Sequence, residues 1–264
     1  MNIVARELRA NLKSLTIWCI AMILLIAVGM IKYAGLAGAG PGVAELIGQL
    51  PEAIKSILGL DWLDPTTIAG YYGVFFLYFM LLGGIHAVML GAAIISKEER
   101  DKTADFLFVK PVRRRRVITA KLSAVMVNLV VFNLVTLLAS MFFAARYNTG
   151  SSINRQIVCL MLALFFLQVI FAAIGAGISG LVRKPGKALS YAATLFLVMF
   201  FLSSAIELYP KIDFLQYLTP FRYFPIGPVM QGTFEPLFIV LTIAISLVFA
   251  GLTYLAFQKR DLLV

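Results

Sequence analysis

Charged residues are scarce in this sequence. Asp, Glu, Lys and Arg make up 14% of its 264 residues, whereas soluble domains carry about 25%. Hydrophobic residues make up 61%, and long apolar runs recur along the whole chain. The composition therefore excludes an ordinary soluble domain and predicts an integral membrane protein. The net charge of +10 does not indicate nucleic-acid binding, because basic residues of membrane proteins gather in cytoplasmic loops beside anionic headgroups.

Residues that could carry chemistry are equally few. The two cysteines, Cys19 and Cys159, lie in apolar runs, and the single histidine has no cysteine near it, so there is no metal-ligand spacing. The stretch "GLVRKPGKALS" has a Gly-Lys pair but lacks the earlier Gly and the following Ser or Thr of a phosphate-binding loop. We therefore expect this chain to hold no catalytic, cofactor or metal site, and not to hydrolyse ATP alone.

Six segments are apolar over the roughly 20 residues that a spanning helix needs. They cover residues 15–33, 70–95, 117–145, 156–181, 187–208 and 236–257. None shows the strict alternation of a barrel strand, so helices are the structure that satisfies the backbone in hydrocarbon. Residues 1–264 are thus predicted to form a single all-α transmembrane domain.

Lys and Arg are shared unevenly between the two sides of the membrane. Seventeen of the 23 lie in the N-terminus, loop 96–121, loop 182–187 and the C-terminus, and six lie in the opposite loops. Because basic residues accumulate inside, both termini are predicted to be cytoplasmic in a multi-pass protein of the cell membrane.

Short helices are also expected outside the spans. Residues 1–14 can form an amphipathic interfacial helix with Val4, Leu8 and Leu12 toward lipid, and a plain extension of the first span is the alternative. Residues 209–236 hold five of the ten prolines. That density predicts short helices that dip into the outer leaflet.

Few polar side chains lie within the spans. Two roles are open for His86, Asn133 and Gln168: they line a substrate pathway, or they form hydrogen bonds between helices. Asn128 is expected to form such hydrogen bonds. Ion-coupled carriers place carboxylates or paired charges at mid-membrane, so their absence disfavours a secondary transporter.

Small residues mark one face of the fourth span. Ala172, Ala176 and Gly180 recur every four residues, a spacing that allows two helices to approach closely. The partner is expected to be a helix of the same chain, with a seam between two copies as the alternative.

The chain's charge is concentrated in "SKEERDKTADFLFVKPVRRRRVITAK", residues 96–121, which hold nine of the basic residues. Residues 97–109 have helical character, and Ala104, Leu107 and Phe108 form an apolar stripe at helical spacing. Because this helix lies outside the membrane, lipid or another protein must cover the stripe. The arginines 113–116 then mark where the third span re-enters the headgroups.

This loop resembles the cytoplasmic loop of ABC type-2 transporter permeases, which commonly reads "E-x-x-G-T-x-E-x-L-x-x-x-P-V-S-R…K". The residues that carry the resemblance are Glu98, Glu99, Lys102, Thr103, Asp105, Leu107, Pro111, Val112, Arg113 and Lys121. The N-terminal "RELR" is similar to the family's elbow helix, and "YLTPFRYFPIGPVMQG" resembles its "SPFxYF" segment before the sixth span. The family's Gly before Thr is Lys102 here, its second acid is Asp105, and Arg114 departs from the usual Ser-Arg arrangement.

The resemblance implies a permease with six transmembrane helices, an N-terminal elbow helix, a cytoplasmic coupling helix at 97–109 and short outer-leaflet helices before the sixth span. It also implies two separate ATPase subunits, which hold ATP and Mg, and a second permease, identical or homologous. The substrate would be amphiphilic: a peptide, a lipid-linked molecule or a drug. The implied ATPase-docking residues are Glu98, Glu99, Arg100, Thr103, Asp105, Leu107, Phe108, Pro111 and Arg113, with Arg6, Glu7 and Arg9 in the elbow helix.

Two other functions remain open at this point. A membrane assembly or regulatory factor would have the same spans without the docking helix. An ion-coupled secondary transporter would need no ATPase.

Overall fold

The computed structural model describes residues 3–38, 48–52, 54–55, 60, 63–100, 114–148, 150, 152–182 and 184–259. Its long helices are α1 (Ile3–Gly38), α4 (Ile68–Arg100), α6 (Arg114–Tyr147), α7 (Asn154–Leu181), α8 (Pro185–Leu208) and α10 (Pro236–Lys259). Each contains a stretch that is long and apolar enough to cross a membrane, which gives six candidate spans. The predicted all-helical architecture with six spans is confirmed.

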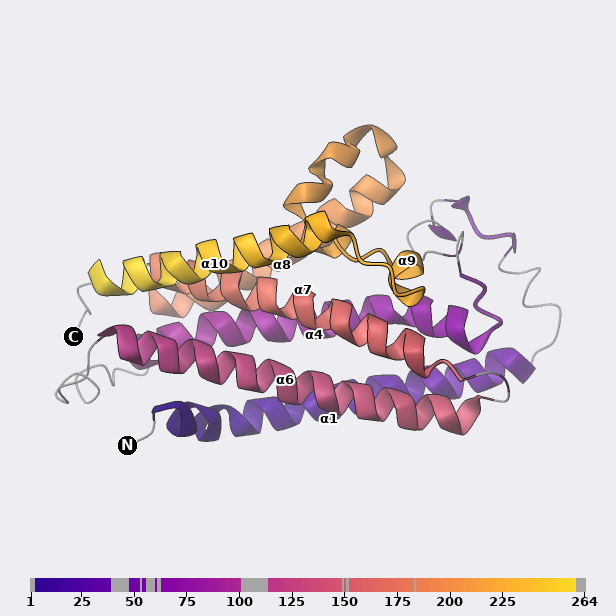
Figure 1. The fold of residues 1–264 in the computed structure, drawn as a ribbon, viewed down its shortest axis with the longest axis horizontal. Coiled ribbons are helices and arrows are strands. Elements are labelled where there is room, and N and C mark those ends of the chain that lie inside the picture. Colours follow the sequence, from indigo (N-terminus) through magenta and orange to yellow (C-terminus); the bar gives the residue numbers. More distant parts are fainter. Residues whose placement is uncertain are drawn as a thin grey trace.

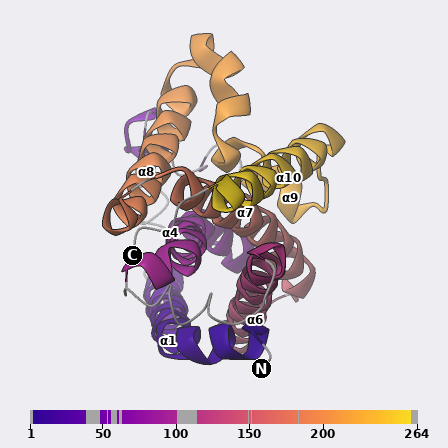
Figure 2. The ribbon, with the colours of Figure 1, turned by 90° about the vertical axis from the view of Figure 1, so that its left-hand side faces the viewer.

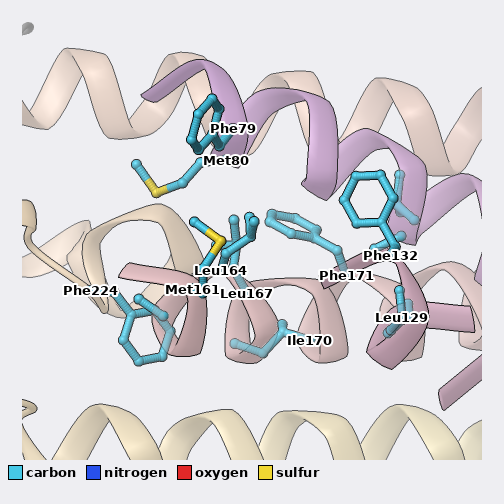
Figure 3. Close-up of a cluster of buried hydrophobic side chains, with 14 of the residues drawn as sticks. Phe79, Met80, Leu129, Phe132, Met161, Leu164, Leu167, Ile170, Phe171 and Phe224 are labelled. Carbon is cyan, nitrogen blue, oxygen red and sulfur yellow. The ribbon is translucent and has the colours of Figure 1, made fainter. Parts of the chain in front are cut away.

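The six long helices run along a common axis, and α1 begins at the same end of the bundle where α10 ends (Figure 1). Helix α7 lies between α4 and α10 and packs extensively against both, while α1 packs mainly on α6 (Figure 2). Large side chains fill the layer between α4 and α7, with Phe79 and Met80 facing Leu164 and Phe171 (Figure 3). This layer is the centre of the buried core.

Helices α4 and α7 touch backbone to backbone. A Cβ atom built on Gly91 would lie 2.0 Å from the carbonyl oxygen of Ala172, and one built on Gly175 would lie 2.1 Å from that of Val88. On the other side of α7, a Cβ on Gly180 would lie 3.2 Å from the Cβ of Ala256 in α10. The predicted small-residue face thus packs within one chain, and the alternative of a seam between two copies is wrong because its residues are buried here.

Several helix ends differ from the predicted ones. Residues 3–14 continue into the first span within α1, one helix of 36 residues, which agrees with the alternative of a plain extension of that span. Figure 2 shows its indigo beginning crossing the end of the bundle toward α6, whereas the rest of α1 runs along the bundle. Helix α4 continues to Arg100, so residues 97–100 of the predicted coupling helix belong to it. The length of an apolar run indicates where the chain leaves the hydrocarbon of the membrane. A helix continues beyond that point when the polar residues that follow still favour helical structure.

The short helices predicted after the fifth span are present. They are η1 (Pro210–Leu218), η2 (Pro220–Arg222) and α9 (Ile226–Met230). The hydroxyl of Thr219 donates to the carbonyl of Met199 at 2.8 Å, so η1 folds back along the last nine residues of α8, about 13 Å of helix. Figure 1 shows this return beside the end of α8. Phe221 then anchors η2 against Phe171 and Phe196, with ring centroids 5.3 Å away in each case.

Candidate functional site at the charged end of the bundle

The candidate site lies at the charged end, defined as the end where α1 and α6 begin and α4 and α10 end (Figure 1). Residues 101–113 connect α4 to α6 at this end. Thr103, Asp105, Leu107, Phe108, Pro111 and Arg113 therefore lie outside the described residues. Glu98, Glu99 and Arg100 are the last residues of α4, and their side chains are likewise outside the described set. The predicted docking role of all these residues stays a prediction.

The three predicted elbow residues face different ways. Arg9 is exposed, whereas Glu7 is 1% exposed. The carboxylate of Glu7 accepts a hydrogen bond from Arg6 at 2.7 Å, and Lys97 of α4 lies 3.9 Å from its other oxygen. Val4 and Leu8 are partly buried and pack against the core, although both were predicted to face lipid. Leu12 is 58% exposed.

Lys121 of α6 is completely buried and donates a hydrogen bond to the carbonyl of Ile94 in α4. An ammonium group out of water is very costly unless it is paired, so this contact fixes α6 against the last turns of α4. Lys121 is one of the residues that carry the family resemblance. Its burial could not be inferred from the sequence, where it reads as a headgroup cation at the start of a span.

Helix α6 is also joined to α10. The guanidinium of Arg114 donates to the carbonyls of Phe257 at 3.4 Å and Gln258 at 3.3 Å. One turn further, the hydroxyls of Thr119 and Tyr254 lie 2.8 Å apart. The two residues that flank segment 101–113, Arg100 and Arg114, therefore belong to helices that are tied to α1 and α10 at the charged end.

Two of the three predicted pathway residues, Asn133 and Gln168, are in contact, and His86 lies among aromatic rings. Asn133 donates to the side-chain oxygen of Gln168 at 2.9 Å, and Gln168 donates to the carbonyl of Gly83 at 3.4 Å. These bonds join α6, α7 and α4. His86 lies between Trp18 and Phe132, with centroids 5.4 and 4.7 Å away.

The hydrogen bonding of these polar groups differs in part from what the sequence indicates. His86 was expected to bond a neighbouring helix, yet its Nδ1 has no hydrogen-bond partner among the described residues. Asn128 was also expected to bond between helices, but its amide donates to the carbonyl of Ala124 in its own helix at 2.7 Å. His86, Asn133 and Gln168 are all buried within one chain.

One charged group at the opposite end was not anticipated. Arg222 of η2 forms an ion pair with Glu207 at the end of α8 and lies 3.9 Å from Asp213 of η1. Burial lowers the pKa of Arg222 from its ordinary value. The pair holds the returning segment to α8, and sequence separation alone gives no sign that the residues meet.

No group of three or more His, Cys, Asp or Glu residues that could hold a metal ion occurs in the part of the chain that the structure describes. A family model described as ABC-2 family transporter protein matches residues 1–262. No curated protein matches the chain.

Proposed function

The chain belongs to the ABC-2 family of transporter proteins, as its non-catalytic membrane permease, and we propose that it exports an amphiphilic substrate using ATP hydrolysed by two separate subunits. The geometry of the charged end carries this proposal. Both helices that flank segment 101–113 are bonded there to further helices. A force applied to the segment would therefore reach α1, α4, α6 and α10 together.

The proposed docking element is the segment 97–109, whose first four residues are the last four of α4. Leu107 and Phe108 would insert into a groove of the ATPase, since apolar anchors supply most of the binding energy of such an interface. Glu98, Glu99, Arg100 and Asp105 would form a charged rim that fixes the register, with Thr103, Pro111 and Arg113 completing the contact. Arg9 is exposed at the same end of the molecule and would lie beside the ATPase.

The mechanism then follows from the contacts. Closure of the two ATPases on ATP would push the end of α4. The buried bond between Lys121 and Ile94 would pass the displacement to α6, and Arg114 would pass it to α10. Contacts between packed helices transmit movement because a packed interface has few alternative arrangements.

A second permease, identical or homologous, would complete the pathway. Helices α8 and α10 expose large apolar side chains, among them Phe201 at 66% and Leu247 at 67%, which suit contact with lipid, with amphiphilic cargo or with another permease. His86, Asn133 and Gln168 would meet substrate only if α4, α6 and α7 separated during transport. The excess of basic residues predicts that the charged end is cytoplasmic.

Co-purification tests the proposal. The tagged chain, extracted in detergent from its own cells, should bring down a soluble ATPase with a phosphate-binding loop, identified by mass spectrometry. Leu107→Asp combined with Phe108→Asp should abolish its recovery, because each change places a carboxylate in an apolar groove. Leu181→Asp is the matched control: Leu181 is 59% exposed at the end of α7, at the charged end, and it is not one of the proposed docking residues.

Other outcomes would support the rival functions. Recovery of the chain with no ATPase would refute the proposal and favour an assembly or regulatory factor. Transport by the purified chain alone would favour a secondary transporter.

A further inference from the structure

Glu7 is a buried carboxylate at the charged end. Its side chain is 1% exposed, although it lies only seven residues from the beginning of the sequence. Burial of a carboxylate is unfavourable unless cations and hydrogen bonds replace the lost water. Glu7 is therefore held in this position by its surroundings and is poorly placed to contact a second protein.

Two cations from different helices face the two oxygens of Glu7. Arg6, its neighbour in α1, lies 2.7 Å from Oε1, and Lys97 of α4 lies 3.9 Å from Oε2. Within the described residues Oε2 has no hydrogen-bond partner, so Lys97 holds it by charge alone. The backbone carbonyl of Glu7 accepts a further bond from the side chain of Asn11 at 3.0 Å.

The location of Lys97 gives the contact its consequence. Lys97 lies at the end of the apolar span of α4, four residues before segment 101–113. If the end of α4 moved away from α1, Lys97 would leave Glu7, and the buried carboxylate would keep only Arg6 of these two cations. Movement of the beginning of α1 together with α4 keeps both cations and therefore costs less free energy.

We propose that Glu7 is a positioning residue that couples the beginning of α1 to the end of α4, so that both move together when the ATPase displaces segment 101–113. The inference rests on the proposed function. It reverses the role that the sequence indicates for Glu7, because the carboxylate acts inside the permease and not on the ATPase.

Two reporter positions separate coupling from general damage. Lys13→Cys in α1 and Arg116→Cys in α6 replace exposed residues at the charged end, each in a background where Cys19 and Cys159 are changed to Ala. The complex, purified with its ATPase, is labelled with a water-soluble maleimide before and after trapping with ATP and vanadate. In the wild-type background both labelling rates should change on trapping.

Glu7→Gln should reduce the response at Lys13→Cys about fivefold, the upper end for an ion pair with a partly exposed partner, because the charge that attracts Lys97 is removed. The response at Arg116→Cys should persist, since Lys121 still joins α6 to α4. ATPase recovery should also persist. Lys97→Gln removes the same ion pair from its more exposed partner, and the exchange Glu7→Lys with Lys97→Glu should restore part of the response.

An unchanged response at Lys13→Cys in both Glu7→Gln and Lys97→Gln would overturn the inference, and so would loss of the response at both reporters. Loss of ATPase recovery in Glu7→Gln would assign the residue to docking instead. If the wild-type chain brings down no ATPase, the proposed function itself fails, and that result is visible before any variant is labelled.

Discussion

The crossing of α4 and α7 gives the sharpest prediction for the fold. Gly175→Ala adds one methyl group where the structure has no room for it. The new Cβ would lie 2.1 Å from the carbonyl oxygen of Val88, and ordinary contact begins at 3.4 Å. The helices must therefore separate by about 1.3 Å, the difference between the two distances. Backbone cannot turn aside as a flexible side chain can.

The magnitude follows from two opposing effects. Overpacking a closely packed interface costs about 1–3 kcal/mol, whereas replacing Gly by Ala in a helix stabilises it by about 0.5–1 kcal/mol. Separation would also loosen the layer in which Phe79 faces Leu164 and Phe171 (Figure 3). We expect Gly175→Ala to lower the free energy of unfolding by about 1 kcal/mol, the cost of overpacking less the gain in helix propensity. Gly91→Ala should act similarly, because its Cβ would lie 2.0 Å from the carbonyl oxygen of Ala172.

The assay is unfolding in mixed detergent micelles with increasing dodecyl sulfate, followed by circular dichroism. Gly251→Ala in α10 is the matched control, since no heavy atom lies within 4 Å of the added Cβ, and it should be neutral or stabilising. The double variant Gly91→Ala with Gly175→Ala should lose less than the sum of the single losses, because one separation relieves both clashes. Equal stability of Gly175→Ala and Gly251→Ala would refute the reasoning.

Three further predictions concern polar groups. His86→Phe should leave stability unchanged or raise it, because a buried polar atom without a hydrogen bond is removed; altered ATP hydrolysis by the complex would instead place His86 on the transport path. Arg222→Gln should lower the free energy of unfolding by about 1 kcal/mol. A double-mutant cycle with Glu207→Gln should give a coupling energy that decreases in high salt, and a coupling energy independent of salt would contradict an ion pair. Two hydrogen bonds from Thr66 lower the pKa of Asp64 from its ordinary value of 3.8. The ionised carboxylate therefore stabilises the folded state above pH 3.8, and this stabilisation is lost as the pH falls through the lowered pKa of the folded state. Melting at pH 5 and pH 3 should show a larger acid loss for wild type than for Asp64→Asn, and equal losses would contradict it.

The sequence indicated the number and approximate location of the spans because each depends on a local property, an apolar run of bilayer length. The short helices between α8 and α10 were predicted for a similar reason, since proline limits helices wherever it occurs. Helix ends were less accurate. Helix α4 continues through Lys97 to Arg100, because a change in polarity marks the membrane boundary and does not end a helix.

The resemblance in loop 96–121 and in the segment around Phe221 led to the family that the comparison with known proteins shows. Motif residues are recognisable without knowledge of their contacts. The same loop illustrates the limit, since Lys121 is part of the motif and yet its bond to Ile94 was not foreseen.

The sequence by itself therefore determined a six-span helical membrane protein and its family, because hydropathy and motif spacing are written along the chain. The tertiary structure decided which side of each helix is covered and by what: that the carboxylate of Glu7 is buried beside Lys97, that Asn128 bonds its own helix, and that Arg222 meets Glu207. The physical reason is that burial and ion pairing depend on distances between segments far apart in the chain, and those distances are set only when the helices pack.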